Sequence, residues 1–347
     1  MKQQWTDDVI GWFRENRRPL PWREGKDPYH IWLSEVMLQQ TRIEAVIPYY
    51  FRFLTALPTI ADLAGCPEEQ LLKLWEGLGY YSRARHLKRA AQIIMQEYGG
   101  VMPRHAKDLR ALPGIGEYTA GAIASIAFGE PEPAVDGNVL RVYARLFGIG
   151  DNVLLDATKK RVTRELFALY PAGDKAGALT EGLMELGERV CIPGATPLCA
   201  QCPLEQQCVA HRDNTTDVIP LRVKTTERKK EIMTVFVLRC GDRFAVKKRP
   251  ARGLLAGMWE FYHTSGHRTN KDAPAVLQEV GVRAETIEPL GTKTHLFTHI
   301  EWQMTAYLVT CLEESATLIW KTKEEIDEHC ALPTAFAGFW NKAKEKA

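Results

Sequence analysis

Apolar and polar positions follow two different patterns along the chain, and the change falls between residues 210 and 230. Up to about residue 210, apolar residues recur at helical spacing between Pro and Gly residues. Residues 68–100, for example, predict two helices separated by a Gly-Tyr-Tyr break. Beyond residue 230, β-branched and aromatic residues dominate three strand-like stretches, 232–239, 243–249 and 301–310. Helical patterns return at 273–281, at 322–330 and at the C-terminus.

These two patterns predict a multidomain protein in which an all-α part is followed by an α+β part. We place the helical domain at residues 1–212 and the α+β domain at residues 231–347. Residues 213–230 are polar and charged, contain one proline, and are predicted to form the linker between the two domains.

Composition narrows the class of protein only a little. The chain has 347 residues, 45% hydrophobic and 25% charged, which is typical of a soluble globular protein long enough for two domains. No apolar run is long enough to cross a bilayer, and the N-terminal MKQQWTDD lacks a secretory signal pattern. We therefore expect a cytoplasmic protein with reduced thiols and no membrane partner. The net charge of +2 gives no sign of a nucleic-acid partner, so any DNA-binding surface must be local.

Four of the eight cysteines gather within residues 191–208, with the spacing C-x7-C-x2-C-x5-C. A [4Fe–4S] cluster needs one thiolate for each iron, so four cysteines on one compact loop suit it. The alternatives are a structural zinc site, which usually presents two close pairs of ligands, and four unrelated buried thiols. The predicted cluster ligands are Cys191, Cys199, Cys202 and Cys208.

A sharp turn at residues 113–116, Pro-Gly-Ile-Gly, separates two helical patterns at 107–112 and 118–128. Gly114 and Gly116 leave backbone N–H groups unobstructed by side chains, and amides at the start of a helix bind a phosphate without sequence preference. The turn is therefore typical of a helix-hairpin-helix that binds a DNA backbone. The alternative is a tight corner in an all-α protein.

Two acidic residues stand in contexts that suit acid–base chemistry. Asp27 and the proline after it predict the N-cap and first turn of a helix that runs to Gln40. Glu35 lies in this helix, with apolar residues one turn before it and one turn after it, so that desolvation would raise its pKa. Together with Asp136, which precedes another helix, it suits cleavage of a bond at a sugar C1′ through an oxocarbenium-like state. The alternatives are a buried ion pair for Glu35 and a simple N-cap for Asp136.

Several motifs, in this order along the chain, resemble the helix-hairpin-helix DNA glycosylase superfamily. They are SEVMLQQT, LPGIGEYTAG, VDGNV and the four clustered cysteines. Within this superfamily the chain resembles the A/G-specific adenine DNA glycosylase (MutY) family, because RRPLPWR and GLGYYSRAR match it as well. The similarity extends over nearly the whole chain.

The resemblance implies roles for four residues near the reacting bond. Glu35 would protonate adenine at N7 and then assist the attack of water at C1′. Asp136 would stabilise the sugar cation or trap it covalently, and Asn138 would help to orient the site. Tyr118 would lie beside the reacting nucleotide, in the position where the lyase branch of the superfamily has a nucleophilic lysine.

The resemblance also implies which residues contact the base and the DNA. The residues expected to line the pocket for the flipped adenine are Arg18, Trp22, Leu38 and Glu181. Gln39, Gln40 and Tyr80 are expected to probe and wedge the helix opposite the lesion, and Arg23 and Thr41 are expected to contact the substrate or the DNA. Gly114 and Gly116 would bind the DNA phosphate. On local sequence alone, packing of Tyr80 in a turn is the alternative for that residue.

The C-terminal half resembles the Nudix-like domain with which this family recognises 8-oxoguanine. It lacks the downstream R-E-x-x-E-E carboxylates that hold magnesium in a catalytic Nudix enzyme, so we expect binding without hydrolysis. Phe297, Thr298 and His299 match the recognition loop and would read the oxidised base. The chain departs from the family in two places: Thr298 stands where many members have serine, and the first cysteine gap is one residue longer than usual.

We therefore expect a monomeric, monofunctional glycosylase with a [4Fe–4S] cluster, acting on adenine opposite 8-oxoguanine or G in double-stranded DNA. We expect it in the cytoplasm, associated with the nucleoid. One alternative is a glycosylase-lyase of the endonuclease III type, which would carry a lysine before Thr119 and lack the Nudix-like half. The other is a non-catalytic iron–sulfur protein that binds DNA or senses redox state, which would have no use for Glu35 and Asp136.

Overall fold

A computed structural model of the chain describes residues 4–194, 196–223 and 228–346. The chain forms two compact units, and each is built from two separate stretches. The first unit consists of Met1–Gly65 and His86–Lys224, and the second consists of Cys66–Arg85 and Thr225–Ala347. The domain boundaries that we placed from the sequence put residues 66–85 in the helical part, and they stay a prediction.

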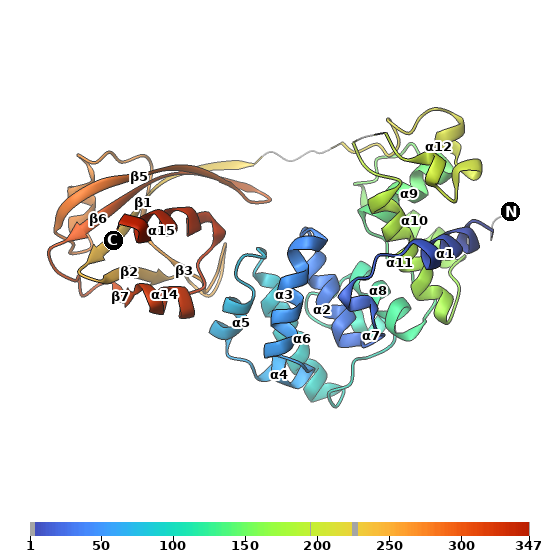
Figure 1. The fold of residues 1–347 in the computed structure, drawn as a ribbon, viewed down its shortest axis with the longest axis horizontal. Coiled ribbons are helices and arrows are strands. Elements are labelled where there is room, and N and C mark those ends of the chain that lie inside the picture. The colour runs from blue at the N-terminus through green and yellow to red at the C-terminus, as the bar shows by residue number, and fades with distance from the viewer. Residues whose placement is uncertain (1–3, 195, 224–227, 347) are drawn as a thin grey trace. The chain divides into compact units, whose positions relative to one another are not determined.

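The first unit is helical (Figure 1). Its α-helices are α1 (Gln4–Asn16), α2 (Pro28–Leu38), α3 (Ile43–Ala56), α4 (Ile60–Gly65), most of α6 (Ser82–Glu97), α7 (Ala106–Ala111), α8 (Glu117–Phe128), α9 (Gly137–Phe147), α10 (Asp156–Phe167), α11 (Asp174–Arg189) and α12 (Val209–Arg212). Short 3-10 helices lie at Pro21–Arg23, Cys199–Gln201 and Glu205–Gln207. In the part of the chain that the structure describes, no helix is both long and apolar enough to cross a membrane.

The predicted hairpin joins α7 to α8. Gly114 has a φ of +78°, a conformation that side chains with a Cβ rarely adopt, and an added Cβ would lie 2.6 Å from the Cβ of His86. Gly116 is the exposed N-cap of α8. The start of α8 is therefore formed by small residues at the surface, as a phosphate-binding helix terminus requires.

Two glycines allow the segment that carries Asp136 to pack closely between helices. A Cβ on Gly121 of α8 would lie 2.3 Å from the carbonyl oxygen of Pro133. A Cβ on Gly187 of α11 would lie 2.6 Å from the Cβ of Asn138. Both distances are shorter than real Cβ contacts, so a larger residue at either position would displace the residues on either side of Asp136.

The second unit contains a seven-stranded mixed sheet. The strand order is β3-β2-β1-β6-β5, with β4 paired to β1 and β7 paired to β2. β1 and β6 run parallel to each other, and the other pairs are antiparallel. The strands are β1 (Lys229–Cys240), β2 (Arg243–Lys248), β3 (Trp259–Glu260), β4 (Tyr262–Ser265), β5 (Ala284–Leu296), β6 (Ile300–Cys311) and β7 (Ile319–Thr322).

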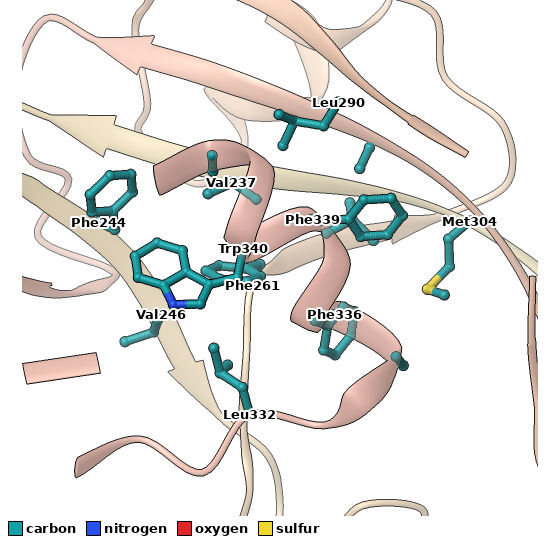
Figure 2. Close-up of a cluster of buried hydrophobic side chains, with 14 of the residues drawn as sticks. Val237, Phe244, Val246, Phe261, Leu290, Met304, Leu332, Phe336, Phe339 and Trp340 are labelled. Atoms are coloured by element: carbon teal, nitrogen blue, oxygen red, sulfur yellow. The ribbon is translucent and has the colours of Figure 1, made fainter. Parts of the chain in front are cut away.

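Helices cover both faces of this sheet, so successive residues of β1 are buried on opposite sides. On one face, α14 (Lys323–His329) and α15 (Thr334–Lys346) pack against the sheet, and Phe336 and Trp340 of α15 lie beside Phe244 and Phe261 (Figure 2). On the other face, α13 (Ala273–Gln278) packs against a second apolar cluster. Burial on both faces explains why β1 reads as a continuous apolar run.

Helix α5 (Glu68–Leu74) and the residues that follow it belong to the second unit. Glu76 accepts a hydrogen bond from the backbone N–H of Leu332 at 2.7 Å. Lys248 of β2 forms an ion pair with Glu69 at 2.5 Å. Polar contacts thus join the stretch 66–85 to the C-terminal half of the chain.

The predicted fold class, an all-α part followed by an α+β part, is confirmed. Several details differ from the sequence prediction, which did not include strands β3, β4, β5 and β7. Helix α2 ends at Leu38 instead of Gln40, because Gln39 has a non-helical ψ of 107° and Gln40 has a φ of +60°. Strand β5 is not apparent in the sequence, because it lies at the edge of the sheet and most of its side chains face solvent.

We predict that Gly121→Ala destabilises the protein by about 1–3 kcal/mol, because the new methyl group overlaps a backbone carbonyl that cannot move away freely. The matched control is Gly11→Ala in the exposed part of α1, where an added Cβ meets nothing within 4 Å. That change should stabilise the helix by roughly 0.5–1 kcal/mol. Chemical denaturation of both variants measures the difference, and equal stability of the two would contradict this account of the packing.

Candidate active site

Glu35 lies at the centre of the first unit on α2, a helix that begins with the N-cap predicted from the sequence. The Asp27 side chain accepts a hydrogen bond from the backbone N–H of Tyr29 at 2.7 Å. Glu35 is 6% exposed, and Tyr118 of α8 donates a hydrogen bond from its hydroxyl to Glu35 Oε2 at 2.5 Å. The partner of Glu35 is therefore a phenol, whereas the ion pair with an arginine that we considered is formed by other glutamates.

The pKa of Glu35 is raised to about 7, chiefly by burial and also by the negative charges of Asp136 and Glu181. The hydrogen bond from Tyr118 and the charge of Arg23 act in the opposite direction. A carboxyl group with a pKa near 7 can hold a proton at neutral pH and still release it, as a general acid must.

Burial also raises the pKa of Tyr118 well above its usual value, and the adjacent carboxylates Glu35 and Asp136 add to this effect. The phenol is therefore neutral at physiological pH. It can donate a hydrogen bond, but it does not offer an amine or another strong nucleophile.

Asp136 is the N-cap of α9, as the alternative interpretation of the sequence held. Its Oδ1 accepts the backbone N–H of Val139 at 2.7 Å, and its Oδ2 accepts the side-chain amide of Asn138 at 2.9 Å. Burial raises the pKa of Asp136, while these hydrogen bonds lower it. An N-cap role does not exclude a chemical one, because Asp136 also lines the large cleft of this unit.

A chain of hydrogen bonds connects Asp136 to the cysteine loop. Arg141 donates to the side-chain oxygen of Asn138 at 2.8 Å and to the backbone oxygen of Cys191 at 2.7 Å. Arg141 is 5% exposed, so these contacts hold a buried cation. The geometry of the loop and the orientation of Asp136 therefore depend on the same guanidinium.

Two adjoining cavities surround Glu35. We call the larger one, of about 590 Å³, the outer cleft, and the smaller one, of about 50 Å³, the inner pocket. The outer cleft is lined by Glu35, Leu38, Gln39, Gln40, Gly114, Gly116, Glu117, Tyr118, Thr119, Val135, Asp136, Asn138, Met184 and Glu188. The residues predicted from the sequence that line the inner pocket are Arg18, Trp22, Arg23, Glu35, Leu38 and Glu181.

The structure thus brings most of the predicted first-unit residues together around these two cavities. Thr41 lines neither, and its hydroxyl donates to the backbone oxygen of Gln39 at 3.5 Å. The sequence interpretation missed Glu185 and Glu188. Together with Glu181 they follow an i, i+4, i+7 spacing on α11, a line of carboxylates on one helix face that is visible in the sequence.

Glu185 is fully buried, and arginines neutralise its negative charge. Arg18 donates to it from Nε at 2.7 Å and from Nη2 at 2.8 Å, and Arg23 donates at 3.0 Å. Burial alone would raise the pKa of Glu185, but these contacts lower it to about 2. Arg23 also binds Glu181 at 2.8 Å. The inner pocket is therefore lined by arginine and glutamate side chains that bind one another.

The four predicted cluster ligands lie close enough to influence one another. Burial raises the pKa of Cys202 to about 12, and the charges of the other three cysteines add to this effect. Their side chains do not converge as ligands of one ion do, since no three His, Cys, Asp or Glu side chains within the described residues meet in that way. Thiolates that each bind a different iron stand farther apart than the ~3.8 Å between thiolates that share one zinc.

Arg145 provides a further observation on this loop. It is 4% exposed and donates a hydrogen bond to Cys191 Sγ at 3.3 Å. A buried cation beside a sulfur can donate a charge-assisted hydrogen bond to a metal-bound thiolate. Four thiols on one loop with such a donor fit an iron–sulfur cluster.

The remaining predicted residues lie together in the second unit. Phe297, Thr298 and His299 connect β5 to β6, and the hydroxyl groups of Tyr80 and Thr298 are 3.2 Å apart. All four line one cavity of about 510 Å³, which we call the second-unit cavity. Phe297 packs edge-on against Trp302, with 4.8 Å between ring centroids. Its ring therefore also packs against the hydrophobic core of the second unit.

Comparison with known families defines the class of protein. Residues 33–172 match the HhH-GPD superfamily of base excision DNA repair proteins, and residues 234–342 match the NUDIX domain. The first unit is also similar to solved structures of this class. A thermostable thymine-DNA glycosylase gives a TM-score of 0.56 at 30% identity over 61% of this chain and 97% of that one. A trapped endonuclease III–DNA covalent intermediate gives 0.52 at 26% identity over 62% of this chain and 98% of that one.

Curated relatives narrow the class to one family. The adenine DNA glycosylase of Homo sapiens is 34% identical over 86% of this chain and 65% of its own length. That of Buchnera aphidicola subsp. Acyrthosiphon pisum (strain APS) is 30% identical over 94% of this chain and 93% of its own length. The chain belongs to the adenine DNA glycosylase family, which confirms the resemblance, and it spans just under two thirds of the human relative.

We predict that Glu35→Gln changes stability in a pH-dependent way. The folded-state pKa of about 7 lies above the unfolded value of 4.5, so folding retains a proton that the unfolded chain releases between these values. The stability that wild type owes to the retained proton should therefore be fully present below pH 4.5. It should be lost as the pH rises through 7, and it should stay absent above that pH. The variant has no titrating group at position 35, so its free energy of unfolding should rise by up to about 3 kcal/mol relative to that of wild type between pH 4.5 and pH 8.

Urea unfolding at the two pH values measures this gain. Glu97→Gln, which removes an exposed carboxylate at the end of α6, is the control and should show no such gain. A difference between Glu35→Gln and wild type that stays constant with pH would mean that Glu35 ionises normally in the folded protein.

Proposed function

We propose that this protein is a monofunctional adenine DNA glycosylase that hydrolyses the bond between adenine N9 and the sugar C1′, opposite 8-oxoguanine or guanine. The observation that carries the proposal is the pair Glu35 and Tyr118. A buried carboxyl group with a pKa of about 7 is hydrogen-bonded to a neutral phenol at the place where the inner pocket and the outer cleft adjoin. The names of the curated relatives support the same activity.

The reaction begins with a proton transfer. Glu35 donates its proton to N7 of the flipped adenine, the C1′–N9 bond breaks, and its electron pair leaves with the base. The sugar is then an oxocarbenium-like cation. Water adds its oxygen to C1′ and returns a proton to Glu35, so that the products are adenine and an abasic site.

Asp136 is suited to stabilise the cation or to bond to it covalently for a time, because it lines the same cleft as Glu35. Asn138 and the backbone N–H of Val139 keep its carboxylate oriented. In this proposal, Asn138 acts through Asp136 and does not touch the substrate.

Tyr118 distinguishes this reaction from that of a lyase. A lyase needs an amine that attacks C1′ and forms a Schiff base, and a phenol held to Glu35 by a hydrogen bond cannot do so. Water is therefore the final nucleophile, and the abasic strand stays intact. A non-catalytic DNA-binding protein would have no need for a carboxyl group that holds its proton at neutral pH.

The inner pocket is the proposed site for the flipped adenine. Arg18, Arg23 and Glu181 supply charged hydrogen-bonding groups, and Trp22 and Leu38 supply apolar walls. Trp22 is 8% exposed and packs edge-on against Tyr50, which fixes its ring. A pocket with a few oriented polar groups and apolar walls is typical of base recognition.

DNA contacts are proposed for the surface around this pocket. The N-terminus of α8, at Gly114 and Gly116, would bind a phosphate without reading sequence. Gln39, Gln40 and Thr41 follow α2, where they would contact the helix that the base has left. A separate contact is proposed for Tyr80 of the second unit, which has 45% of its surface exposed and would act as the wedge.

Recognition of 8-oxoguanine is proposed for Phe297, Thr298 and His299, which line the second-unit cavity with Tyr80. The hydroxyl and imidazole groups can hydrogen-bond to the added oxygen and N–H of the oxidised base. The added methyl group of threonine at position 298 leaves its hydroxyl in place, within 3.2 Å of Tyr80. We propose that the protein acts as a monomer on chromosomal DNA.

Cys191, Cys199, Cys202 and Cys208 would hold a [4Fe–4S] cluster. When bound, the cluster supplies four iron–thiolate bonds that hold residues 191–208 in a single conformation. Arg145 would hydrogen-bond to one of the ligating sulfurs, and Arg141 would transmit the position of the loop to Asn138. No step of the glycosylase reaction passes through the metal.

The central experiment compares Glu35→Gln with wild type on duplexes that contain A·8-oxoguanine or A·G. The variant should bind both duplexes nearly as wild type does, but its adenine release should fall by at least about 100-fold, because a general acid–base catalyst is lost without a change of shape. Single-turnover excision and borohydride trapping are the measurements. Glu97→Gln is the matched control and should excise adenine normally.

Two outcomes would count against the proposal. Excision by Glu35→Gln at more than a few per cent of the wild-type rate would remove Glu35 from the reaction. A borohydride-trapped adduct with the wild-type protein would favour the lyase alternative.

We predict that the purified protein contains about four irons per chain and shows the broad visible absorbance of an iron–sulfur cluster. Cys199→Ser should lose most of this iron, because one of the four thiolate ligands is missing. Cys240→Ser, which changes a half-buried cysteine outside the loop, should keep it. A colourless wild-type protein with one zinc per chain would support the zinc alternative instead.

A further inference from the structure

Glu188 lies where the inner pocket and the outer cleft adjoin. Only four residues line both cavities among those that the structure describes: Glu35, Leu38, Met184 and Glu188. A base that moves from the outer cleft into the inner pocket must therefore pass Glu188. Its side chain is 37% exposed, so it has room to move.

Glu188 is bound to a residue of the inner pocket. Arg18 donates a hydrogen bond from Nη2 to Glu188 Oε2 at 2.6 Å. The same nitrogen donates to Glu185 at 2.8 Å. The ion pair with Glu188 thus lies across the entrance and uses an N–H group of the guanidinium that faces the proposed base pocket.

The hydrogen bonds of Arg18 to Glu185 and to Glu188 differ greatly in strength. Glu185 is fully buried and accepts both Nε–H and Nη2–H of Arg18, so breaking that contact would remove two charge-assisted hydrogen bonds from the interior. Glu188 forms a single contact that solvent partly screens, and such pairs contribute little to stability. If one contact opens, it is the contact with Glu188, while Arg18 stays in place.

We infer that Glu188 weakens the binding of the flipped base at the entrance of its pocket, where its ion pair with Arg18 competes with the entering base for the same N–H group. The inference rests on the proposed function. Since Glu188 acts only before the base is seated, it controls the binding of the flipped base and takes no part in breaking the C1′–N9 bond.

The test separates competition for Arg18 from the simple removal of a negative charge near DNA. Two duplexes are used, both with 8-oxoguanine in the opposite strand. One carries 2′-fluoro-2′-deoxyadenosine, in which the electron-withdrawing fluorine opposes formation of the sugar cation and so prevents cleavage. The other carries an abasic-site analogue with no base to enter the pocket. Dissociation constants are measured for wild type and variants by fluorescence anisotropy.

Glu188→Gln should tighten binding of the adenine-analogue duplex by about two- to fivefold more than binding of the abasic duplex, which is the magnitude of a partly exposed ion pair. Glu188→Asp keeps the charge but is too short for the contact, and it should show the same selective gain. The matched control is Glu117→Gln, which removes a charge from the exposed start of α8 in the same cleft. It should change the affinity of both duplexes by the same factor.

Equal effects of Glu188→Gln on the two duplexes would overturn the inference, because they would show a charge effect alone. Weaker binding of the adenine-analogue duplex would overturn it as well, because Glu188 would then support Arg18 instead of competing with the base. Failure of the proposed function shows separately, as a wild-type protein that releases no adenine from either A·8-oxoguanine or A·G duplexes.

Discussion

A buried carboxyl group with a pKa near 7 is the constraint on which the first unit depends. Glu35 satisfies it because α2, α8 and α11 together exclude water from its side chain. The hydrogen bond from Tyr118 works against this effect, since it favours the ionised form. The carboxyl group is therefore poised between its two states, and neither burial nor the phenol alone would place it there.

The same constraint explains the distribution of charge around Glu35. Three carboxylates on α11 lie near Arg18 and Arg23. The negative charge of Glu181 helps to retain the proton on Glu35, whereas Glu185 is ionised and serves as an anchor for cations. Glu181 and Glu185 lie four positions apart on one helix, yet the pKa of Glu181 is raised and the pKa of Glu185 is lowered. Glu185 accepts hydrogen bonds from several arginines, whereas Glu181 accepts one, from Arg23.

Features that depend on nearby residues were predictable from the sequence. Asp27 caps α2, the strands β1, β2 and β6 follow their β-branched patterns, and the apolar neighbours of Glu35 indicated its burial. The family interpretation, drawn from short motifs, is confirmed. The roles of the site residues stay predictions, although the structure places most of them around two adjoining cavities.

Other features could not be predicted from the sequence. They depend on contacts between residues that are distant in sequence, or on solvent-exposed segments that lack a hydrophobic pattern. The contact of Arg18 with Glu188 joins positions 170 residues apart, so no local rule could find it. Strand β5 is polar because it pairs on one side only and faces solvent. The need for glycine at position 121 becomes visible only when the carbonyl of Pro133 is placed against it.

The second unit is formed by two separate stretches of the chain, and this affects the order in which it can fold during synthesis. Residues 66–85 leave the ribosome long before β1, β2 and the segment that contains Leu332, yet Glu69 and Glu76 have their partners there. Contacts between segments so distant in sequence form slowly, because a long loop must close first. Glu69 and Glu76 therefore lack these partners until residues 248 and 332 have been synthesised, and the segment 66–85 can complete its contacts only after that point.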